Sequence, residues 1–236
     1  MVYHLKETQF PFADSTAQHP ANSGRLPRSS TGIVGQGITL NGSTSYLDVG
    51  SLNLGDTFTL SAWLNLSPQA TSIQTVWANK TGGSNTDGFA LFANSWQTAD
   101  GRSLLETGNS TSGHLTASPT HQIQASQWQQ LTAVIQRTNH TATLFINGSN
   151  IASSVNLPDN FATRASLRLG QFHDGLFPLL GKIDEARIES TQRSPDWIHA
   201  TWLNIASNTT FTSYSSVLRL TPSLTVERKQ DQLTIR

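Results

Sequence analysis

The predicted strand that contains Asp184 carries a carboxylate in a position that indicates burial. Ala186 and Ile188 lie two residues apart and share an apolar face, and Asp184 lies on that same face. A carboxylate that points toward a core is costly unless hydrogen bonds or a cation compensate its charge. Two arrangements follow: a carboxylate paired with backbone amides and Arg187 or Lys182, or a bound Ca²⁺, which prefers carboxylate and carbonyl oxygens.

Three loops combine an aromatic residue with polar groups, as sugar-binding surfaces do. A sugar offers an apolar ring face together with hydroxyls, which amide, carboxylate and guanidinium groups can bind. The candidate ligand-binding residues are Trp77, Asn79, Trp96, Asp100, Arg102, His173 and Asp174. The alternative for each loop is ordinary packing, because isolated aromatic residues are common on protein surfaces.

Common catalytic signatures are missing from the sequence. It contains no Gly-x-Ser-x-Gly, no His-Glu-x-x-His and no phosphate-binding loop, and its seven histidines are scattered. We therefore predict no catalytic residues and no zinc site.

Short strands are expected throughout the first 190 or so residues, and their alternation predicts an all-β fold. In 57–66 and 141–147, apolar residues occupy every second position. Asn41-Gly42 and Asn147-Gly148 are typical hairpin turns. We predict a two-sheet antiparallel sandwich of the jelly-roll type.

One short helix is predicted near 194–204. Ser194 is a suitable N-cap, Pro195 fits the first helical position, and Asp196 complements the helix dipole. The apolar stripe that begins at Trp197 indicates a helix that packs on the sandwich.

We expect two units in the chain: a sandwich over residues 1–208 and an extension over residues 209–236. The extension contains a proline at 222 and a predicted hairpin between 224–226 and 233–235, which is typical of the start of a following domain. The first residues lack the pattern of a signal peptide, and no window is apolar enough to span a membrane.

Charge and cysteine content narrow the function classes. Only 13% of residues are charged, the net charge is zero, and there is no cysteine. Nucleic acid and direct membrane insertion are therefore not expected, and disulfides are excluded.

Taken together, these segments resemble the laminin G-like (LamG) bacterial modules with a concanavalin A-like jelly roll. The resemblance spans roughly residues 1–205, and its ending, 193–204, is similar to versions in multidomain bacterial surface proteins. The ordered pieces that carry it are Tyr3–Glu7 with Asp14–Thr16, Gly37–Gly42 with Tyr46–Val49, Phe58–Trp63, Trp128–Ala133, Ala142–Gly148 and Gly181–Ile188.

This resemblance implies binding, often with a structural calcium. Glu7 matches an acidic position from which related jelly rolls reach the calcium site, so Glu7 and Asp184 are the candidate metal ligands. Glucanases of this fold use a Glu-x-Asp-x-x-Glu strand, but Lys182 and Arg187 stand at the glutamate positions here.

We therefore expect a non-catalytic recognition module that binds carbohydrate. The alternatives are a protein-contact or spacer module without a small ligand and, more remotely, a glycoside hydrolase. The resemblance implies that the other domains of a larger parent chain flank the module, and that it works outside the cell, in the periplasm or at the cell surface.

Overall fold

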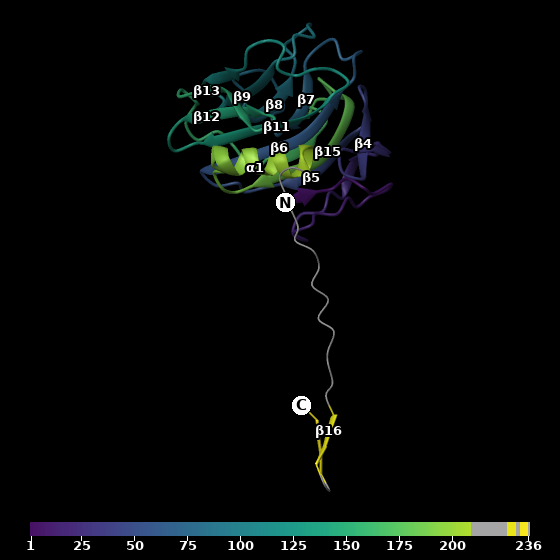
Figure 1. Cartoon of the computed structure of the whole chain (residues 1–236). Coiled ribbons are helices and arrows are strands. Elements are labelled where there is room, and N and C mark those ends of the chain that lie inside the picture. The colour runs from purple at the N-terminus through teal and green to yellow at the C-terminus, as the bar shows by residue number, and fades with distance from the viewer. Residues whose placement is uncertain (209–225, 230–231, 236) are drawn as a thin grey trace.

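The main body of the chain is a sandwich of two antiparallel sheets (Figure 1). The computed structural model describes residues 1–208, 226–229 and 232–235. In the first sheet the spatial order is β13 (Ser149–Ser154), β12 (Thr141–Ile146), β11 (Trp128–Gln136), β6 (Thr57–Leu66), β15 (Leu180–Glu189), β4 (Gln36–Asn41) and β3 (Arg28–Thr31), and β1 (Val2–Tyr3) also pairs with β15. In the second sheet the order is β10 (Gly113–Ala117), β9 (Ser103–Gly108), β8 (Gly88–Ala93), β7 (Gln74–Ala78), β14 (Ser166–Leu169), β5 (Tyr46–Ser51) and β2 (Ser23–Arg25). The predicted jelly-roll sandwich is confirmed.

The core lies between the two sheets and follows the alternation that the sequence predicts. In β6, Phe58, Leu60 and Leu64 are at most 2% exposed and belong to the main apolar cluster. The opposite sheet contributes Phe89 and Leu91 to that cluster, and the rings of Phe58 and Phe89 lie 5.2 Å apart. Burying each such side chain stabilises the fold by about 1.5–3 kcal/mol, so this face fixes the register of β6.

Only one of the two predicted Asn-Gly hairpins forms. Asn147-Gly148 joins β12 to its neighbour β13, and both residues have positive φ. Asn41-Gly42, in contrast, leads from β4 in the first sheet to β5 in the second, so the hairpin predicted there is wrong. The Asn41 side chain instead accepts hydrogen bonds from the backbone amides of residues 43–45, which turns the chain from one sheet to the other.

The predicted helix is confirmed as α1 (Pro195–Ala206), which lies across the outer face of the first sheet (Figure 1). The Ser194 side chain caps it by accepting from the Trp197 amide at 3.2 Å. Ile198 is 1% exposed and packs against Val134 and Phe145 of that sheet. Over the described residues, no helix is long and apolar enough to cross a bilayer.

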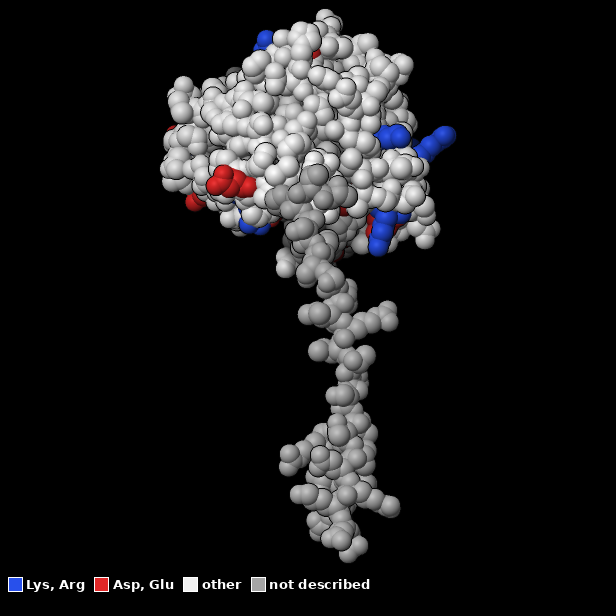
Figure 2. Space-filling model, in the orientation of Figure 1, with Lys and Arg blue, Asp and Glu red and all other residues white. Residues whose placement is uncertain are grey.

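Charged side chains are sparse on the face that carries α1. Figure 2 shows them as separate groups among uncharged atoms, in keeping with a charged content of 13%.

At the C-terminal end, β16 (Val226–Lys229) pairs with β17 (Gln232–Ile235), so the predicted hairpin forms over these residues. Residue 224 and the proposed start of the extension at 209 lie outside the described residues, and the domain boundary stays a prediction.

The strand around Asp184 contains a β-bulge that the sequence pattern did not reveal. Ile183 pairs with Leu64 and Ile188 pairs with Leu60, and all four side chains point into the core. Residues five apart on a regular strand would face opposite sides, so the register shifts between Asp184 and Arg187. Glu185 adopts a φ of 47° at the shift.

The bulge places Asp184 on the other face of the sheet. It pairs with Trp63, whose neighbours on β6 face the core, so Asp184 does not share a face with Ala186 and Ile188. The predicted burial is nevertheless confirmed, because Asp184 is 0% exposed. The predicted facing was wrong because one extra residue reverses the alternation.

A second buried carboxylate ties the N-terminal segment together. Asp14 is 5% exposed and accepts hydrogen bonds from the amides of Val2 at 2.8 Å and Thr16 at 3.0 Å, and from the Thr16 hydroxyl. Burial opposes ionisation of Asp14, but these hydrogen bonds outweigh it and lower its pKa to about 2.

We expect Asp14→Asn to destabilise the protein by about 1–2 kcal/mol at pH 7. The pKa of Asp14 is lower in the folded state than its usual 3.8, so the stabilisation is present above that value and is lost as pH falls toward 2. Urea unfolding at pH 7, 5 and 3 tests this. The difference between the two proteins should shrink at pH 3, and an equal difference at all three pH values would contradict the account.

Candidate functional site

An apolar patch covers part of the outer face of the second sheet. Alternation along β7, β8 and β9 sends some side chains into the core and the others outward. The outward group forms a cluster of its own: Ala78, Ala90, Phe92, Leu104 and Phe172, with Ile73, Ala117 and Phe177 partly buried against it. Its five main members are at most 5% exposed, so the neighbouring loops cover this cluster.

Two of the loops singled out from the sequence meet over this patch. The Trp96 ring lies 5.4 Å from the Phe177 ring in an edge-to-face arrangement, and Phe177 in turn lies 6.0 Å from Phe92. Trp96 is nevertheless 61% exposed. The neighbouring rings therefore support one edge of the indole and leave a large part of it open to a ligand.

The loops and strands enclose a cavity of about 270 Å³. It combines aromatic and aliphatic side chains with two carboxylates, as sites for small polar ligands do. Its lining consists of Ile73, Gly82, Gly83, Phe92, Trp96, Glu106, Phe172, Asp174, Leu176 and Phe177. We call this space the Trp96 cavity.

A buried lysine lies behind the carboxylate of Glu106. Lys80 is 0% exposed, and its Nζ donates to Glu106 Oε1 and to the Ser84 carbonyl, each at 2.7 Å. Burial lowers the pKa of Lys80, and the neighbouring Glu106 opposes that effect. The ion pair fixes Glu106 at the cavity wall and connects it to the 79–87 loop, which contributes Gly82 and Gly83.

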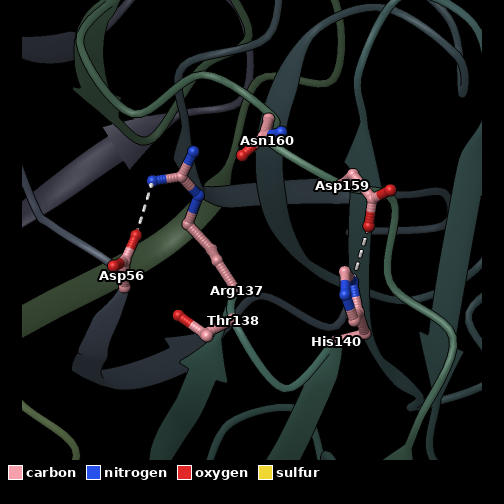
Figure 3. A pocket seen from close by; sticks show the side chains of 6 residues that line it. All are labelled: Asp56, Arg137, Thr138, His140, Asp159 and Asn160. Carbon is pink, nitrogen blue, oxygen red and sulfur yellow. Dashed lines mark ion pairs between the residues drawn. The ribbon is translucent and has the colours of Figure 1, made fainter.

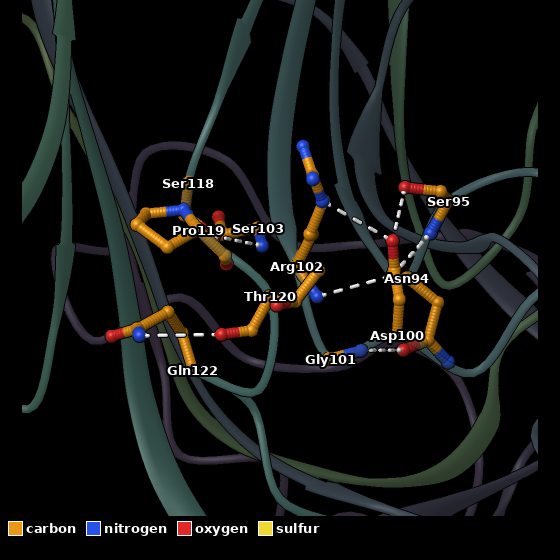
Figure 4. Close-up of polar contacts among 10 residues, drawn as sticks. All are labelled: Asn94, Ser95, Asp100, Gly101, Arg102, Ser103, Ser118, Pro119, Thr120 and Gln122. Carbon is orange, nitrogen blue, oxygen red and sulfur yellow. Dashed lines mark hydrogen bonds and ion pairs between the residues drawn. The ribbon is translucent and has the colours of Figure 1, made fainter.

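Asp100 holds the loop that carries Trp96. Its carboxylate accepts from the Ser95 amide at 2.9 Å and from the Ser95 hydroxyl at 2.7 Å, and it pairs with Arg102 Nε at 3.3 Å (Figure 4). Burial opposes ionisation of Asp100, but the Ser95 bonds and Arg102 lower its pKa. Asp100 is therefore a positioning residue for Trp96, and it does not line the cavity.

The Phe172–Phe177 loop places its two candidate residues differently. Asp174 lines the cavity, and its Oδ1 accepts from the Leu176 amide at 2.9 Å. The His173 ring forms a hydrogen bond with the Ser166 carbonyl. The backbone carbonyl of His173 accepts from the Arg168 guanidinium at 3.0 Å. His173 therefore fastens the loop to β14, while Asp174 faces the site.

Two candidates from the sequence are buried away from any ligand. Trp77 is 0% exposed in the core between the sheets, and its indole donates to the Ser61 carbonyl. Asn79 is 1% exposed and bonds the Phe89 amide and the Ala162 carbonyl. Both predictions of ligand contact are corrected: these side chains point inward and hold the fold.

A separate pocket of about 350 Å³ lies near the turn between β11 and β12. Its six lining residues are polar or charged, and four of them form two pairs: Arg137 with Asp56 at 3.7 Å, and His140 with Asp159 at 3.0 Å (Figure 3). The Trp96 cavity is the better ligand site, because it alone of the two combines exposed aromatic surface with carboxylates.

Comparison with known proteins identifies the family. A family model described as the concanavalin A-like lectin/glucanases superfamily matches residues 41–199. The chain belongs to this superfamily. No curated protein matches it in a sequence comparison.

Solved structures of the same fold include sugar-bound domains. Domain 4 of AbnA, an extracellular arabinanase of Geobacillus stearothermophilus, was solved with arabinotriose; it shares 24% identity and a TM-score of 0.66, and the match covers 84% of this chain and 95% of that one. The CBM40 domain of the Ruminococcus gnavus IT-sialidase, bound to α2,3-sialyllactose, shares 19% identity and a TM-score of 0.52, with 70% and 95% coverage. The binding domain of Paraclostridial Mosquitocidal Protein 1 shares 13% identity and a TM-score of 0.67, with 87% and 52% coverage.

The calcium expectation for this concanavalin A-like chain receives no support from the groups around Asp184. Its two oxygens accept from the amides of Val34 at 3.0 Å and Glu185 at 2.8 Å. A Cβ on Gly32 would lie 2.2 Å from Asp184 Oδ2, so glycine is needed for the loop to close over the carboxylate. Burial raises the pKa of Asp184, and the amides only partly oppose this.

The arrangement therefore does not fit a calcium ion at Asp184. Calcium requires six to eight oxygen ligands around it. The groups that point at the Asp184 oxygens are instead N–H donors, which cannot coordinate a cation. In the described part of the chain, no hydrogen bond or ion pair joins Glu7 to Asp184, and no group of three acidic, histidine or cysteine residues could hold a metal. Glu7 Oε2 is itself buried without a partner among the described residues.

The ion pair of Glu106 and Lys80 at the candidate site is not predicted by the sequence analysis. Glu106 follows Leu104 by two residues, so a charged side chain shares the outward face of β9 with an apolar one. That pattern was the available signal. Their contact spans 26 positions and depends on the pairing of β8 with β9, which the sequence alone did not establish.

Proposed function

We propose that the chain is a non-catalytic carbohydrate-binding module and that the Trp96 cavity is its binding site. The observation that carries the proposal is the exposed Trp96 ring, supported by Phe177, beside the carboxylates of Glu106 and Asp174. The ring offers a flat apolar surface to a sugar face, and the carboxylates accept hydrogen bonds from hydroxyls. The sugar-bound domains of the same fold add support.

The test of this proposal is a glycan array probed with the purified chain. We expect binding to at least one oligosaccharide class and loss of that signal in Trp96→Ala. If the wild-type chain binds no glycan, the protein-contact or spacer alternative replaces the proposal.

A hydrolase is the second candidate, because two carboxylates share one cavity. A glycosidase needs one carboxyl as acid and a second as nucleophile or base. Glu106 is engaged by Lys80 and Asp174 by the amide of its own loop, so neither is placed for those roles. We predict no release of reducing ends from β-glucans or arabinan, and detectable release would overturn the non-catalytic part of the proposal.

The module is proposed to belong to a larger exported protein. Support comes from the neighbours described above, which are themselves parts of larger proteins, one of them described as extracellular. Carbohydrate is the proposed partner of the module. By binding it, the module would hold the flanking domains of the parent chain near that carbohydrate.

We infer that no calcium binds at Asp184, and one experiment tests this. Metal bound only by the folded state raises the melting temperature by mass action. Because Asp184 is surrounded by amides, we expect a chelator to leave the melting curve unchanged and no metal to copurify. A drop of several degrees with EDTA, reversed by added Ca²⁺, would instead establish a calcium site.

A further inference from the structure

We propose that the Trp96 cavity selects neutral oligosaccharides and rejects those that carry a carboxylate, such as sialylated or uronic acid-containing sugars. This inference rests on the proposed function and adds the charge class of the ligand. The supporting observation is that carboxylates line the cavity, whereas the basic groups nearby are held away from it.

The cavity wall has an excess of negative charge. Its lining includes the carboxylates of Glu106 and Asp174 and, in the described part of the chain, no lysine or arginine. Lys80 neutralises Glu106 from behind, but it is 0% exposed and cannot contact a ligand. The charge of Asp174 remains, since its bond within the site comes from an uncharged amide.

The nearest basic residue of the Trp96 loop does not supply the missing cation. Arg102 pairs with Asp100 at 3.3 Å and is not part of the cavity lining. Binding a sugar carboxylate normally uses a guanidinium or ammonium group as a direct partner. An anionic sugar placed on Trp96 would instead face the exposed carboxylate of Asp174 without such a partner, and the two like charges would repel.

The same groups favour hydroxyls. Glu106 Oε1 accepts from Lys80, which leaves Oε2 as an acceptor; Asp174 Oδ1 accepts from the Leu176 amide, which leaves Oδ2 as an acceptor. Two acceptor oxygens beside an aromatic ring require a ligand that donates hydrogen bonds. Neutral sugar hydroxyls meet that requirement, whereas a carboxylate only accepts.

The experiment compares matched glycans on one array: lactose with α2,3-sialyllactose, and neutral xylo-oligosaccharides with the same chains bearing glucuronic acid. For every pair in which the neutral sugar binds, we expect the anionic partner to bind at least about tenfold more weakly. The ratio should shrink as salt rises, because ions screen the repulsion. Equal or tighter binding of the anionic partners would overturn this inference and leave carbohydrate binding intact, whereas an empty array would overturn both.

Two variants separate charge from shape. Asp174→Asn removes the unpaired charge, so we expect the neutral-to-anionic ratio to fall by about tenfold, even where the affinity for neutral sugars also falls because one acceptor oxygen is lost. Asp159→Asn is the matched control, because Asp159 is 73% exposed and lies in the other pocket. If Asp174→Asn leaves the ratio unchanged, or the control changes it equally, Asp174 is not the source of the selectivity.

Discussion

Trp96→Ala should weaken oligosaccharide binding about 5- to 100-fold, which corresponds to about 1–3 kcal/mol. The physical reason is the loss of one flat apolar surface on which a sugar face is buried. Because Trp96 is 61% exposed, its removal should change the melting temperature little. Isothermal titration calorimetry with the tightest array ligand measures the effect.

Val155→Ala is the control for this variant, since Val155 is an exposed apolar residue, 68% accessible, that does not line the cavity. It should bind like the wild type. Trp96→Phe keeps an aromatic face and should fall between the wild type and Trp96→Ala. Unchanged binding in Trp96→Ala, with the fold intact, would move the ligand site elsewhere.

The largest effect on stability is expected at Asp184. Asp184→Ala leaves the amides of Val34 and Glu185 without their acceptor, at about 1–3 kcal/mol for each, so the total loss should be about 2–6 kcal/mol. Asp184→Asn should lose less, because its remaining oxygen still accepts one hydrogen bond. Thermal and urea unfolding measure both changes.

Asp56→Ala is the matched control, since Asp56 is 75% exposed and its ion pair with Arg137 is 3.7 Å long. A surface pair of this kind is worth about 0–1 kcal/mol. Binding per folded molecule should be unchanged in both Asp184 variants. A loss of binding without a loss of stability would mean that Asp184 belongs to the ligand site.

Local alternation allowed much of the sandwich to be predicted, but not its irregularities. The apolar face of 57–66 and the cap at Ser194 each depend on a few neighbouring residues, so the sequence indicates them directly. The bulge at Glu185 depends on a left-handed backbone conformation that no residue type in the segment demands. Asn41-Gly42 suits a hairpin, yet tertiary pairing sends its two strands into different sheets.

The candidate site was predicted only in part for the same reason. The loops with Trp96 and Asp174 could be recognised by composition, because aromatic and polar residues occur together in each. Their meeting over Phe92 depends on the order of strands in the second sheet. Trp77 lies on a strand whose register shifts just before it, so its facing could not be read from alternation.

The measurement that tests the central claim most directly is a titration followed through the indole N–H signals by NMR. The chain has six tryptophans, and the indole signal that is missing from Trp96→Phe identifies that of Trp96. On addition of the array ligand, we predict that the Trp96 signal shifts with the binding curve while that of the buried Trp77 stays in place. Saturable binding with an unmoved Trp96 signal would contradict the assignment of the Trp96 cavity as the carbohydrate site.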